Sequence, residues 1–231
     1  MEESAFKLKF KITDSVHTYS PVVNALHWAG FTQTDGSSWN LLWSAPLKPE
    51  TLRNFDMYKH CNHFAGAWQL GRKDLMYRNI SAQIREFGEE YNIVPKTWIL
   101  PHDLRAFQEE RKESDGKHRL WILKPAASSC GRGIRLLARN TNLPKKGQYV
   151  ISTYLMRPHL LNQFKYDMRI YVFVTSFDPL TIFLYQDGLV RFATQPYSTK
   201  NRKQKFAHLT NFSVNKKALN FKNPDSASEE T

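Results

Sequence analysis

Apolar positions recur along the chain in two periods, one typical of strands and one typical of helices. Residues 6–12 alternate lysine with apolar side chains and predict an exposed strand, and residues 39–43 predict another. Between them a serine-proline pair opens a predicted helix, with Ser20 as its N-cap and Gly30 just past its end. The side chains expected to face the core from this helix are Val22, Val23, Leu26, Trp28 and Ala29. These elements predict a small N-terminal α+β domain over residues 1–60.

A second set of elements predicts a central domain over residues 61–154. Residues 62–74 predict a loop, followed by a helix that Asp74 caps and Gly88 ends. Lys73 then lies at the N-terminus of this helix, where the helix dipole disfavours a cation unless an anion binds nearby. An ordinary exposed lysine fits the same spacing.

Short elements of the same domain flank a glycine-rich segment. Residues 97–100 predict a strand, residues 104–113 a charged helix, and residues 114–119 a solvent-exposed linker. After the glycine-rich segment, residues 149–155 predict an apolar strand. The domain therefore mixes strands and helices.

The glycine-rich segment, residues 121–137, predicts two strands joined by a loop of small residues. Gly131 and Gly133 allow positive φ, which turns backbone N–H groups toward a ligand. Lys124 and Arg132 add positive charge. The pattern predicts a flexible flap over an anion such as a nucleotide phosphate, and an ordinary hairpin turn is the alternative.

Strict alternation from residue 165 to residue 170 predicts a strand with one charged face. Lys165, Asp167 and Arg169 share that face, and an almost wholly apolar continuation predicts a central rather than an edge strand. Three charges on a central strand are costly unless they line a polar cleft. A structural ion pair of Asp167 with one neighbour is the alternative.

The last predicted elements belong to a third region, residues 155–217. An Asp187-Gly188 turn predicts a hairpin whose second strand carries Arg191. The segment that follows could bring His208 and Asn211 to the cleft. Residues 218–231 have the composition of a disordered tail.

The balance of charge is strongly basic. Thirty-three Lys and Arg side chains against 21 Asp and Glu give a net charge of +12, which would attract nucleic acid, anionic lipid or an acidic protein tail, or would serve solubility alone. Cys61 and Cys130 have no partner motif, which favours a reducing compartment. A charged start and no long apolar run predict a soluble, intracellular protein without a membrane span.

Five segments together resemble the tubulin–tyrosine-ligase-like family of ATP-grasp enzymes, in the family's own order. These segments are residues 62–74, 121–134, 165–180, 187–194 and 208–217. The sequences of these segments are most similar to those of the tubulin polyglutamylases. The resemblance implies an α/β, ATP-grasp-like fold whose small N-terminal α+β domain and central domain precede an incomplete C-terminal ATP-grasp domain.

The resemblance also implies ATP-dependent addition of glutamate to the acidic C-terminal tails of tubulin, with ATP, Mg²⁺ and free glutamate as co-substrates and cofactor. It implies an acyl-phosphate intermediate on a tubulin carboxylate. The residues it assigns to ATP are Lys73, Lys124, Ser128, Gly131, Arg132, Gly133, Ile151, Ser152, Thr153, Tyr154, Leu155, Lys165 and Asp167, those from 151 to 155 through their backbone. It assigns Arg169 and Arg191 to catalysis, and Arg191, Thr210 and Asn211 to the amino-acid substrate.

One departure from the family pattern concerns the metal. A distal Glu-x-Asn strand that holds Mg²⁺ in the family is absent, since the one such triplet, Glu90-Tyr91-Asn92, stands upstream of the flap. We therefore expect no metal ligand here, a chain truncated at its C-terminus, and weak turnover. A non-catalytic microtubule-binding module is the alternative function.

Nucleic-acid binding is disfavoured, because the basic residues form no single stripe. We expect a monomer that does not bind membranes and is found in the cytoplasm on microtubules, with a cilium or basal body as a further expected place.

Overall fold

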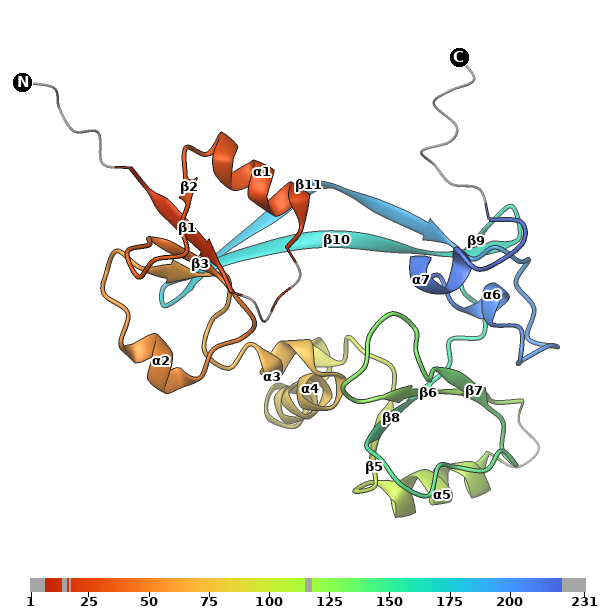
Figure 1. Cartoon of the computed structure of the whole chain (residues 1–231). Coiled ribbons are helices and arrows are strands. Elements are labelled where there is room, and N and C mark those ends of the chain that lie inside the picture. Colours follow the sequence, from red (N-terminus) through yellow and green to blue (C-terminus); the bar gives the residue numbers. More distant parts are fainter. Residues whose placement is uncertain (1–6, 14–15, 17, 115–117, 222–231) are drawn as a thin grey trace, which may run out of the picture. The chain divides into compact units, whose positions relative to one another are not determined.

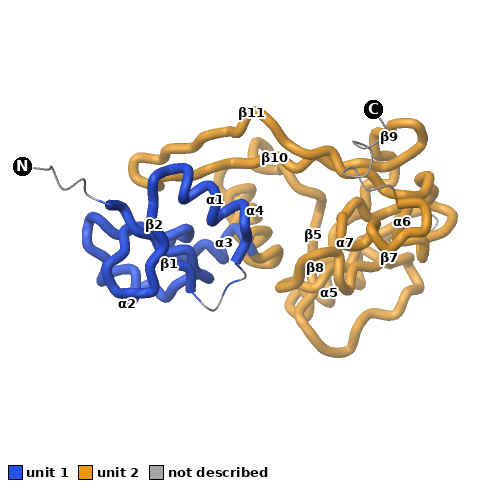
Figure 2. Tube along the Cα trace, turned by 45° about the horizontal axis from the view of Figure 1, so that its top comes forward, with its two compact units in different colours: residues 1–71 blue, residues 72–231 orange. Residues whose placement is uncertain are grey.

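The computed structural model describes residues 7–13, 16, 18–114 and 118–221. The chain divides into two compact units, residues 1–71 and residues 72–231 (Figure 2). The expected boundaries at residues 60, 154 and 217 stay predictions. Helices and strands are mixed in both units, as expected for an α/β protein.

The first unit holds a four-stranded parallel sheet in the order β2-β1-β3-β4 (Figure 1). Its helices lie in the connections between the strands, since α1 follows β1 and α2 follows β3. The elements are β1 (Lys9–Ile12), α1 (Ser20–Trp28), β2 (Thr32–Gln33), β3 (Leu41–Trp43), α2 (Pro49–Arg53), β4 (His60–Cys61) and α3 (Trp68–Gly71).

Three expectations for the first unit were wrong. The strand expected at residues 6–12 is interior rather than exposed, because β1 pairs on both edges and Phe10 is fully buried against the ring of His27. The expected loop at residues 62–74 contains the short helix α3. Residue 6 itself lies outside the described residues.

The third wrong expectation for the first unit concerns the two ends of helix α1. Tyr19 is the N-cap of this helix, and Ser20 is its first residue rather than its cap. Trp28 is 85% exposed because it falls off the stripe that Val22 and Leu26 form four residues apart. Ala29 is exposed as well, since it stands past the helix end.

The second unit begins with α4 (Lys73–Phe87), which ends at Gly88 with a φ of 86° and continues into a 3-10 turn, η1 (Glu89–Tyr91). Arg72 is the N-cap of α4, so the expected cap at Asp74 was wrong. Asp74 is instead the second residue of the helix and accepts two hydrogen bonds from the Arg72 guanidinium. That contact fixes the residue before Lys73.

An antiparallel sheet in the order β5-β8-β6-β7 follows in the second unit. Its elements are β5 (Thr97–Leu100), α5 (Leu104–Glu113), β6 (Trp121–Pro125), β7 (Arg135–Leu137) and β8 (Tyr149–Thr153). The core between this sheet and α5 consists of Trp98, Leu100, Phe107, Trp121, Leu123, Leu137 and Ile151. Ser114 is buried rather than part of an exposed linker, because its hydroxyl closes α5 on the Arg111 carbonyl.

A long two-stranded ribbon completes the strands of this unit. It consists of β10 (Phe164–Phe177) and β11 (Leu180–Phe192), and β9 (Leu160–Leu161) pairs only with the first two residues of β10. The expected central position of β10 therefore holds at its start alone. Beyond it, apolar side chains such as Phe173 and Phe183 are more than half exposed, because no further strand of the described chain lies beside them.

The hairpin turn of this ribbon lies at Asp178-Pro179, so the turn expected at Asp187-Gly188 was wrong. Gly188 lies within β11 opposite Ile170, next to a shift in strand register. A Cβ at Gly188 would stand 2.5 Å from the carbonyl oxygen of Arg169. The glycine is therefore needed for a close approach of two strands rather than for a turn.

Two single-turn helices, α6 (Lys205–His208) and α7 (Phe212–Asn215), follow the ribbon. The disordered tail expected from residue 218 was wrong for its first four residues. Phe221 packs on Phe212, and the Asn220 amide donates to the Thr194 carbonyl. Residues 222–231 lie outside the described residues.

Candidate functional site

The flap predicted from the glycine pattern is the loop between β6 and β7. Gly131 and Gly133 have φ of 72° and 70°, and a Cβ at either would come within 2.7 Å of a neighbouring side chain, Val214 or Pro125. The flap is held from two sides. Lys73 donates to the Ser128 carbonyl, and the Ser213 hydroxyl donates to the Cys130 carbonyl at 2.8 Å.

A cavity of about 250 Å³ lies under this flap. It brings together residues of α4, β6, the flap, β10 and the start of α7: Lys73, Lys124, Pro125, Ser128, Ser129, Cys130, Gly131, Arg132, Ile134, Arg169 and Asn211. Four of these side chains are cationic and none is acidic. The cavity is therefore suited to an anion.

Three lysines approach one another at this site. Burial lowers the pKa of Lys73, and the charge of Asp74 opposes that effect in part. Burial and then the charge of Lys73 lower the pKa of Lys124. Burial and then the charge of Lys124 lower the pKa of Lys165 to about 8. Lys73 and Lys124 line the cavity and Lys165 does not, but the charge of Lys124 acts on both sides and links the three lysines into what we call the lysine row. An anion would relieve both the burial and the repulsion of these charges.

Asp167 is not free to act as a base, because three hydrogen bonds occupy its carboxylate. Arg191 donates to both oxygens at 2.7 Å, and the Thr210 hydroxyl donates at 2.7 Å as well. Burial alone would raise the pKa of Asp167, but the bonds from Arg191 and Thr210 outweigh it and lower that pKa. The ion pair considered as an alternative in the sequence exists, with Arg191 as the partner of Asp167, and neither residue is among those that line the cavity under the flap.

The segment expected to contact adenine, residues 151–155, is largely occupied by the sheet. Ile151 and Ser152 are buried, and the N–H groups of Thr153 and Tyr154 donate to the carbonyls of Lys96 and Leu120. Among the described residues, Leu155 is the one member of the segment that is exposed and whose N–H donates to no protein group. An adenine contact through this backbone stays a prediction, and Leu155 is the member best placed for it.

A second cavity, of about 280 Å³, shares Ile134 with the one under the flap. Apolar side chains of β7 and α6 line it together with basic ones: Ile134, Arg135, Leu136, Thr141, Arg202, Lys203, Lys205, His208 and Leu209. The sequence pattern did not identify this cavity, because its two halves are about 65 residues apart and neither carries a local motif.

His208 contacts the site indirectly. It is 3% exposed, its Nδ1 lies 2.9 Å from the Tyr154 hydroxyl, and its Nε2 lies 3.1 Å from the Asn201 carbonyl oxygen. Lys165 in turn donates to the Tyr154 hydroxyl at 3.2 Å. The expected approach of His208 to the charged cleft therefore runs through Tyr154, whereas Asn211 lines the cavity itself.

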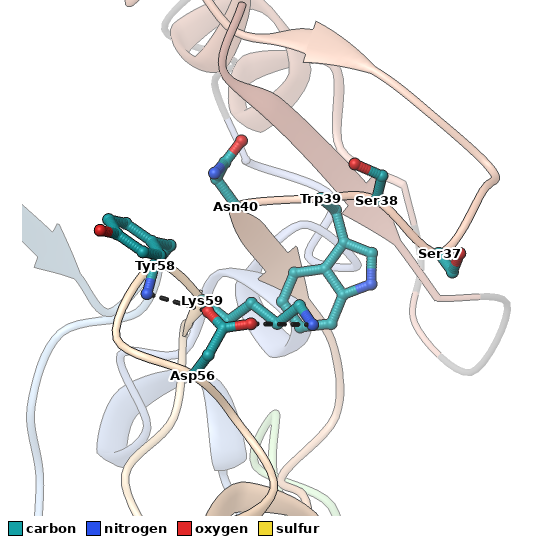
Figure 3. A pocket seen from close by; sticks show the side chains of 7 residues that line it. All are labelled: Ser37, Ser38, Trp39, Asn40, Asp56, Tyr58 and Lys59. Atoms are coloured by element: carbon teal, nitrogen blue, oxygen red, sulfur yellow. Dashed lines mark hydrogen bonds and ion pairs between the residues drawn. The ribbon is translucent and has the colours of Figure 1, made fainter. Parts of the chain in front are cut away.

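A hollow of about 530 Å³ in the first unit differs in its electrostatics. Figure 3 shows Trp39, Asp56, Tyr58 and Lys59 around it. Lys59 pairs with Asp56 at 3.2 Å and lies 5.5 Å from the Trp39 ring centroid. Because its one cation is already neutralised, this hollow lacks the charge that characterises the cavity under the flap.

No group of three or more His, Cys, Asp or Glu side chains is arranged to hold a metal ion within the ranges that the structure describes. None of the helices in those ranges has the length and apolar character needed to cross a membrane.

Comparison with known proteins gives a consistent match over most of the chain. A model of the family described as "Tubulin-tyrosine ligase family" matches residues 51–230. Tubulin monoglutamylase TTLL4 of Homo sapiens is 42% identical over 182 residues, which is 78% of this chain and 15% of that protein. Tubulin polyglutamylase TTLL5 of Mus musculus is 40% identical over 220 residues, or 92% of this chain and 16% of that protein.

A third relative extends the same picture. Tubulin polyglutamylase TTLL7 of Xenopus tropicalis is 41% identical over 193 residues, which is 81% of this chain. The chain spans about 21% of the length of that relative and less of the other two.

Proposed function

The chain belongs to the tubulin-tyrosine ligase family, and we propose that it carries the ATP-binding part of a ligase that adds glutamate to the acidic tails of tubulin. The relatives named as tubulin monoglutamylase and polyglutamylases support this choice of substrate. An α/β arrangement with a flap over a cationic cavity is consistent with the ATP-grasp-like fold of that family.

The observation that carries the proposal is the pair Lys73 and Lys124 in the cavity under the flap, with Lys165 close enough to Lys124 for their charges to repel. Desolvated cations that repel one another gain most from an anion of high charge density. In the proposed complex the triphosphate lies along the lysine row, and Ser128, Gly131, Arg132 and Gly133 close over it. Backbone N–H groups at positive φ add donors of the kind that phosphates accept.

The proposed chemistry has two steps. A side-chain carboxylate oxygen of tubulin takes the γ-phosphoryl group, as the bond to the leaving ADP oxygen breaks, and an acyl phosphate forms. The amino nitrogen of free glutamate then attacks the acyl carbon, loses a proton, and phosphate leaves. Arg169 lines the cavity, and Arg191 is held by Asp167, which precedes Arg169 by two positions on β10. We assign both guanidinium groups to stabilising negative charge in these steps.

Substrate binding is assigned to Arg191, Thr210 and Asn211. Arg191 and Thr210 both contact Asp167, and Asn211 lines the cavity. Binding of the amino acid by Arg191 requires either that its outer N–H groups remain available or that the pair with Asp167 opens. Phosphoryl transfer in such ligases uses Mg²⁺ to neutralise charge on ATP. The described residues offer no cluster for that ion, so we assign it no ligand here.

The distribution of charge supports an acidic partner. Residues 1–71 carry six basic and six acidic side chains, so the net charge of +12 falls entirely within residues 72–231. Those residues also carry the cavity. An acidic tubulin tail would be attracted to this part of the chain, and such a partner implies a cytoplasmic place on microtubules, with the cilium as a further candidate. We propose a monomer, with no role for membranes or nucleic acid.

The direct test is transfer of labelled glutamate to microtubules in the presence of ATP and Mg²⁺. We expect weak but ATP-dependent label in tubulin, and none when subtilisin has removed the acidic tails. A non-catalytic microtubule-binding module predicts instead that the chain pellets with microtubules in a salt-sensitive, tail-dependent way without incorporating label. Label that is independent of ATP would overturn the ligase proposal.

A further inference from the structure

Three buried or partly buried side chains form a chain of hydrogen bonds that ends at the lysine row. Lys165 Nζ lies 3.2 Å from the Tyr154 hydroxyl, which lies 2.9 Å from His208 Nδ1, and His208 Nε2 lies 3.1 Å from the Asn201 carbonyl oxygen. Lys165 belongs to β10, Tyr154 follows β8, and His208 ends α6. This series of hydrogen bonds therefore links β10, the residue after β8, and α6 within the second unit.

The carbonyl of Asn201 fixes the direction of every bond in this series. A carbonyl oxygen can only accept, so Nε2 of His208 carries the hydrogen. Burial and the charge of Lys165 lower the pKa of His208, which keeps the ring neutral at pH 7 and leaves Nδ1 as an acceptor. The Tyr154 hydroxyl must then donate to Nδ1, and its oxygen lone pairs point to the Lys165 ammonium group.

We infer that His208 and Tyr154 are positioning residues, which act together to hold the Lys165 ammonium group in the phosphate row. This inference rests on the proposed ATP site, but it concerns residues that contact no reacting atom. Lys165 also lies 4.8 Å from the centroid of the Tyr154 ring, so the ring and the hydroxyl fix the same cation. Without the hydroxyl, the ammonium group would keep the ring contact and lose its one neutral hydrogen-bond acceptor among the described residues.

The surroundings explain why Lys165 needs such support. Lys124 on β6 repels it, and Asp167 on its own strand attracts it but is occupied by Arg191 and Thr210. Burial and then Tyr197 raise the pKa of Tyr154, which keeps that hydroxyl protonated. Tyr197 packs against His208, and its own hydroxyl donates to the Met156 carbonyl. The Tyr154 oxygen is therefore the acceptor that stabilises Lys165 before an anion binds.

Three substitutions and one double variant separate positioning from packing alone. Tyr154→Phe removes the hydroxyl and keeps the ring. His208→Asn places an oxygen near the position of Nδ1, so the acceptor for Tyr154 remains, whereas His208→Gln keeps a donor toward Asn201 and loses that acceptor. The double variant Tyr154→Phe/His208→Gln asks whether the two residues act as one unit.

The first readout is the titration of Lys165 in the nucleotide-free chain, followed by NMR of ¹³Cε-labelled lysine and assigned with Lys165→Arg. We expect the midpoint near pH 8 to fall in Tyr154→Phe and in His208→Gln, and to stay in His208→Asn. The second readout is ATP affinity by calorimetry. We expect a loss of about three- to tenfold in Tyr154→Phe and His208→Gln, no further loss in the double variant, and a change within about twofold in His208→Asn.

The two measurements distinguish failure of the positioning role from failure of the proposed nucleotide site. An unchanged Lys165 midpoint in Tyr154→Phe, or a His208→Asn variant as impaired as His208→Gln, overturns the positioning role. The expected midpoints in a chain that binds no ATP support the positioning of Lys165 and overturn the proposed nucleotide site instead. If Tyr154→Phe melts below the assay temperature, His208→Gln carries the same test, because it leaves the tyrosine in place.

Discussion

Asp167 and Arg191 face each other across β10 and β11, with Arg191 donating to both carboxylate oxygens at 2.7 Å. Thr210 binds the same carboxylate from the segment before α7, and the neighbouring residues that line the cavity under the flap are Arg169, two positions beyond Asp167, and Asn211, next to Thr210. Asp167 thereby acts as a support for Arg191 and Thr210. The alternating charges of β10 suggest that Asp167 lines a polar cleft by itself, whereas its hydrogen bonds make it the partner of Arg191 and Thr210.

Substitution of Asp167 by asparagine should impair ligation far more than stability. The ion pair is partly exposed, so we expect the free energy of unfolding to fall by about 1 kcal/mol or less. Arg191 and Thr210 would lose their shared partner, and ATP-dependent glutamate transfer should fall more than tenfold. Asp187→Asn, at an exposed carboxylate of β11 that has no ion pair within the described ranges, is the matched control. Equal activity in the two variants would contradict the support role.

Gly131→Ala should move the flap without unfolding the sheet. The added Cβ would meet Val214 at 2.7 Å, and the φ of 72° is unfavourable for alanine. We expect ATP affinity to drop at least tenfold while the melting temperature falls by only a few degrees. Gly71→Ala is the control, because no atom lies within 4 Å of its added Cβ. An ATP affinity equal to that of the unsubstituted chain would show that the flap does not close on the nucleotide.

ATP affinity should fall as pH rises above 8. The pKa of Lys165 in the nucleotide-free chain is about 8, against an ordinary value of 10.5. Above pH 8 Lys165 is mostly a neutral amine, which must take up a proton to become the ammonium group that holds phosphate, so affinity should fall by up to about tenfold per pH unit. Lys124, Asp167, Tyr154 and His208 are the charged or titratable groups that face it.

The free energy of unfolding of the nucleotide-free chain should rise with pH because of Lys165, whereas its ATP affinity falls. Between pH 8 and 10.5 the unfolded chain binds more protons at Lys165 than the folded chain does, so its contribution to the free energy of unfolding rises with pH. Calorimetric titrations of ATP and urea melts at matched pH values measure both trends. Lys165→Met should abolish both, and a Lys165→Met variant with unchanged pH profiles would exclude this lysine as their source.

Stability of the second unit should depend on its buried core, and much less on exposed leucines of the ribbon. Leu123 is 1% exposed within the core between α5 and its sheet, so Leu123→Ala should cost about 3 kcal/mol in the free energy of unfolding. Leu180→Ala, at a leucine 61% exposed, should change it by less than about 0.5 kcal/mol. Urea denaturation measures both, and equal effects would contradict the assignment of this core.

The sequence predicted best those elements that depend on local pattern. The strand at residues 97–100 and the helix at 104–113 have the predicted bounds, and the flap lies between two strands as its glycines indicated. A glycine gave a wrong prediction where it is required by a tertiary contact rather than by a turn. Gly188 follows an aspartate as in a turn, yet it serves the close approach of Arg169.

Other features have no local signal. The apolar run of β10 predicts a covered strand, but cover depends on neighbours that the run itself does not specify. The link from Lys165 through Tyr154 to His208 joins residues up to 54 positions apart, and nothing in the spacing of a lysine, a tyrosine and a histidine reveals it. Only the contact of His208 in α6 with Tyr154, just after β8, does so.

The most direct measurement is calorimetric titration of ATP into the chain and into Lys124→Ala. Lys124 is the middle member of the lysine row and contacts both neighbours electrostatically. We predict one ATP bound per chain, a loss of at least tenfold in affinity for Lys124→Ala, and no change for Lys146→Ala at an exposed lysine outside the cavity. ATP affinity that is the same in all three proteins would contradict the assignment of the phosphate site.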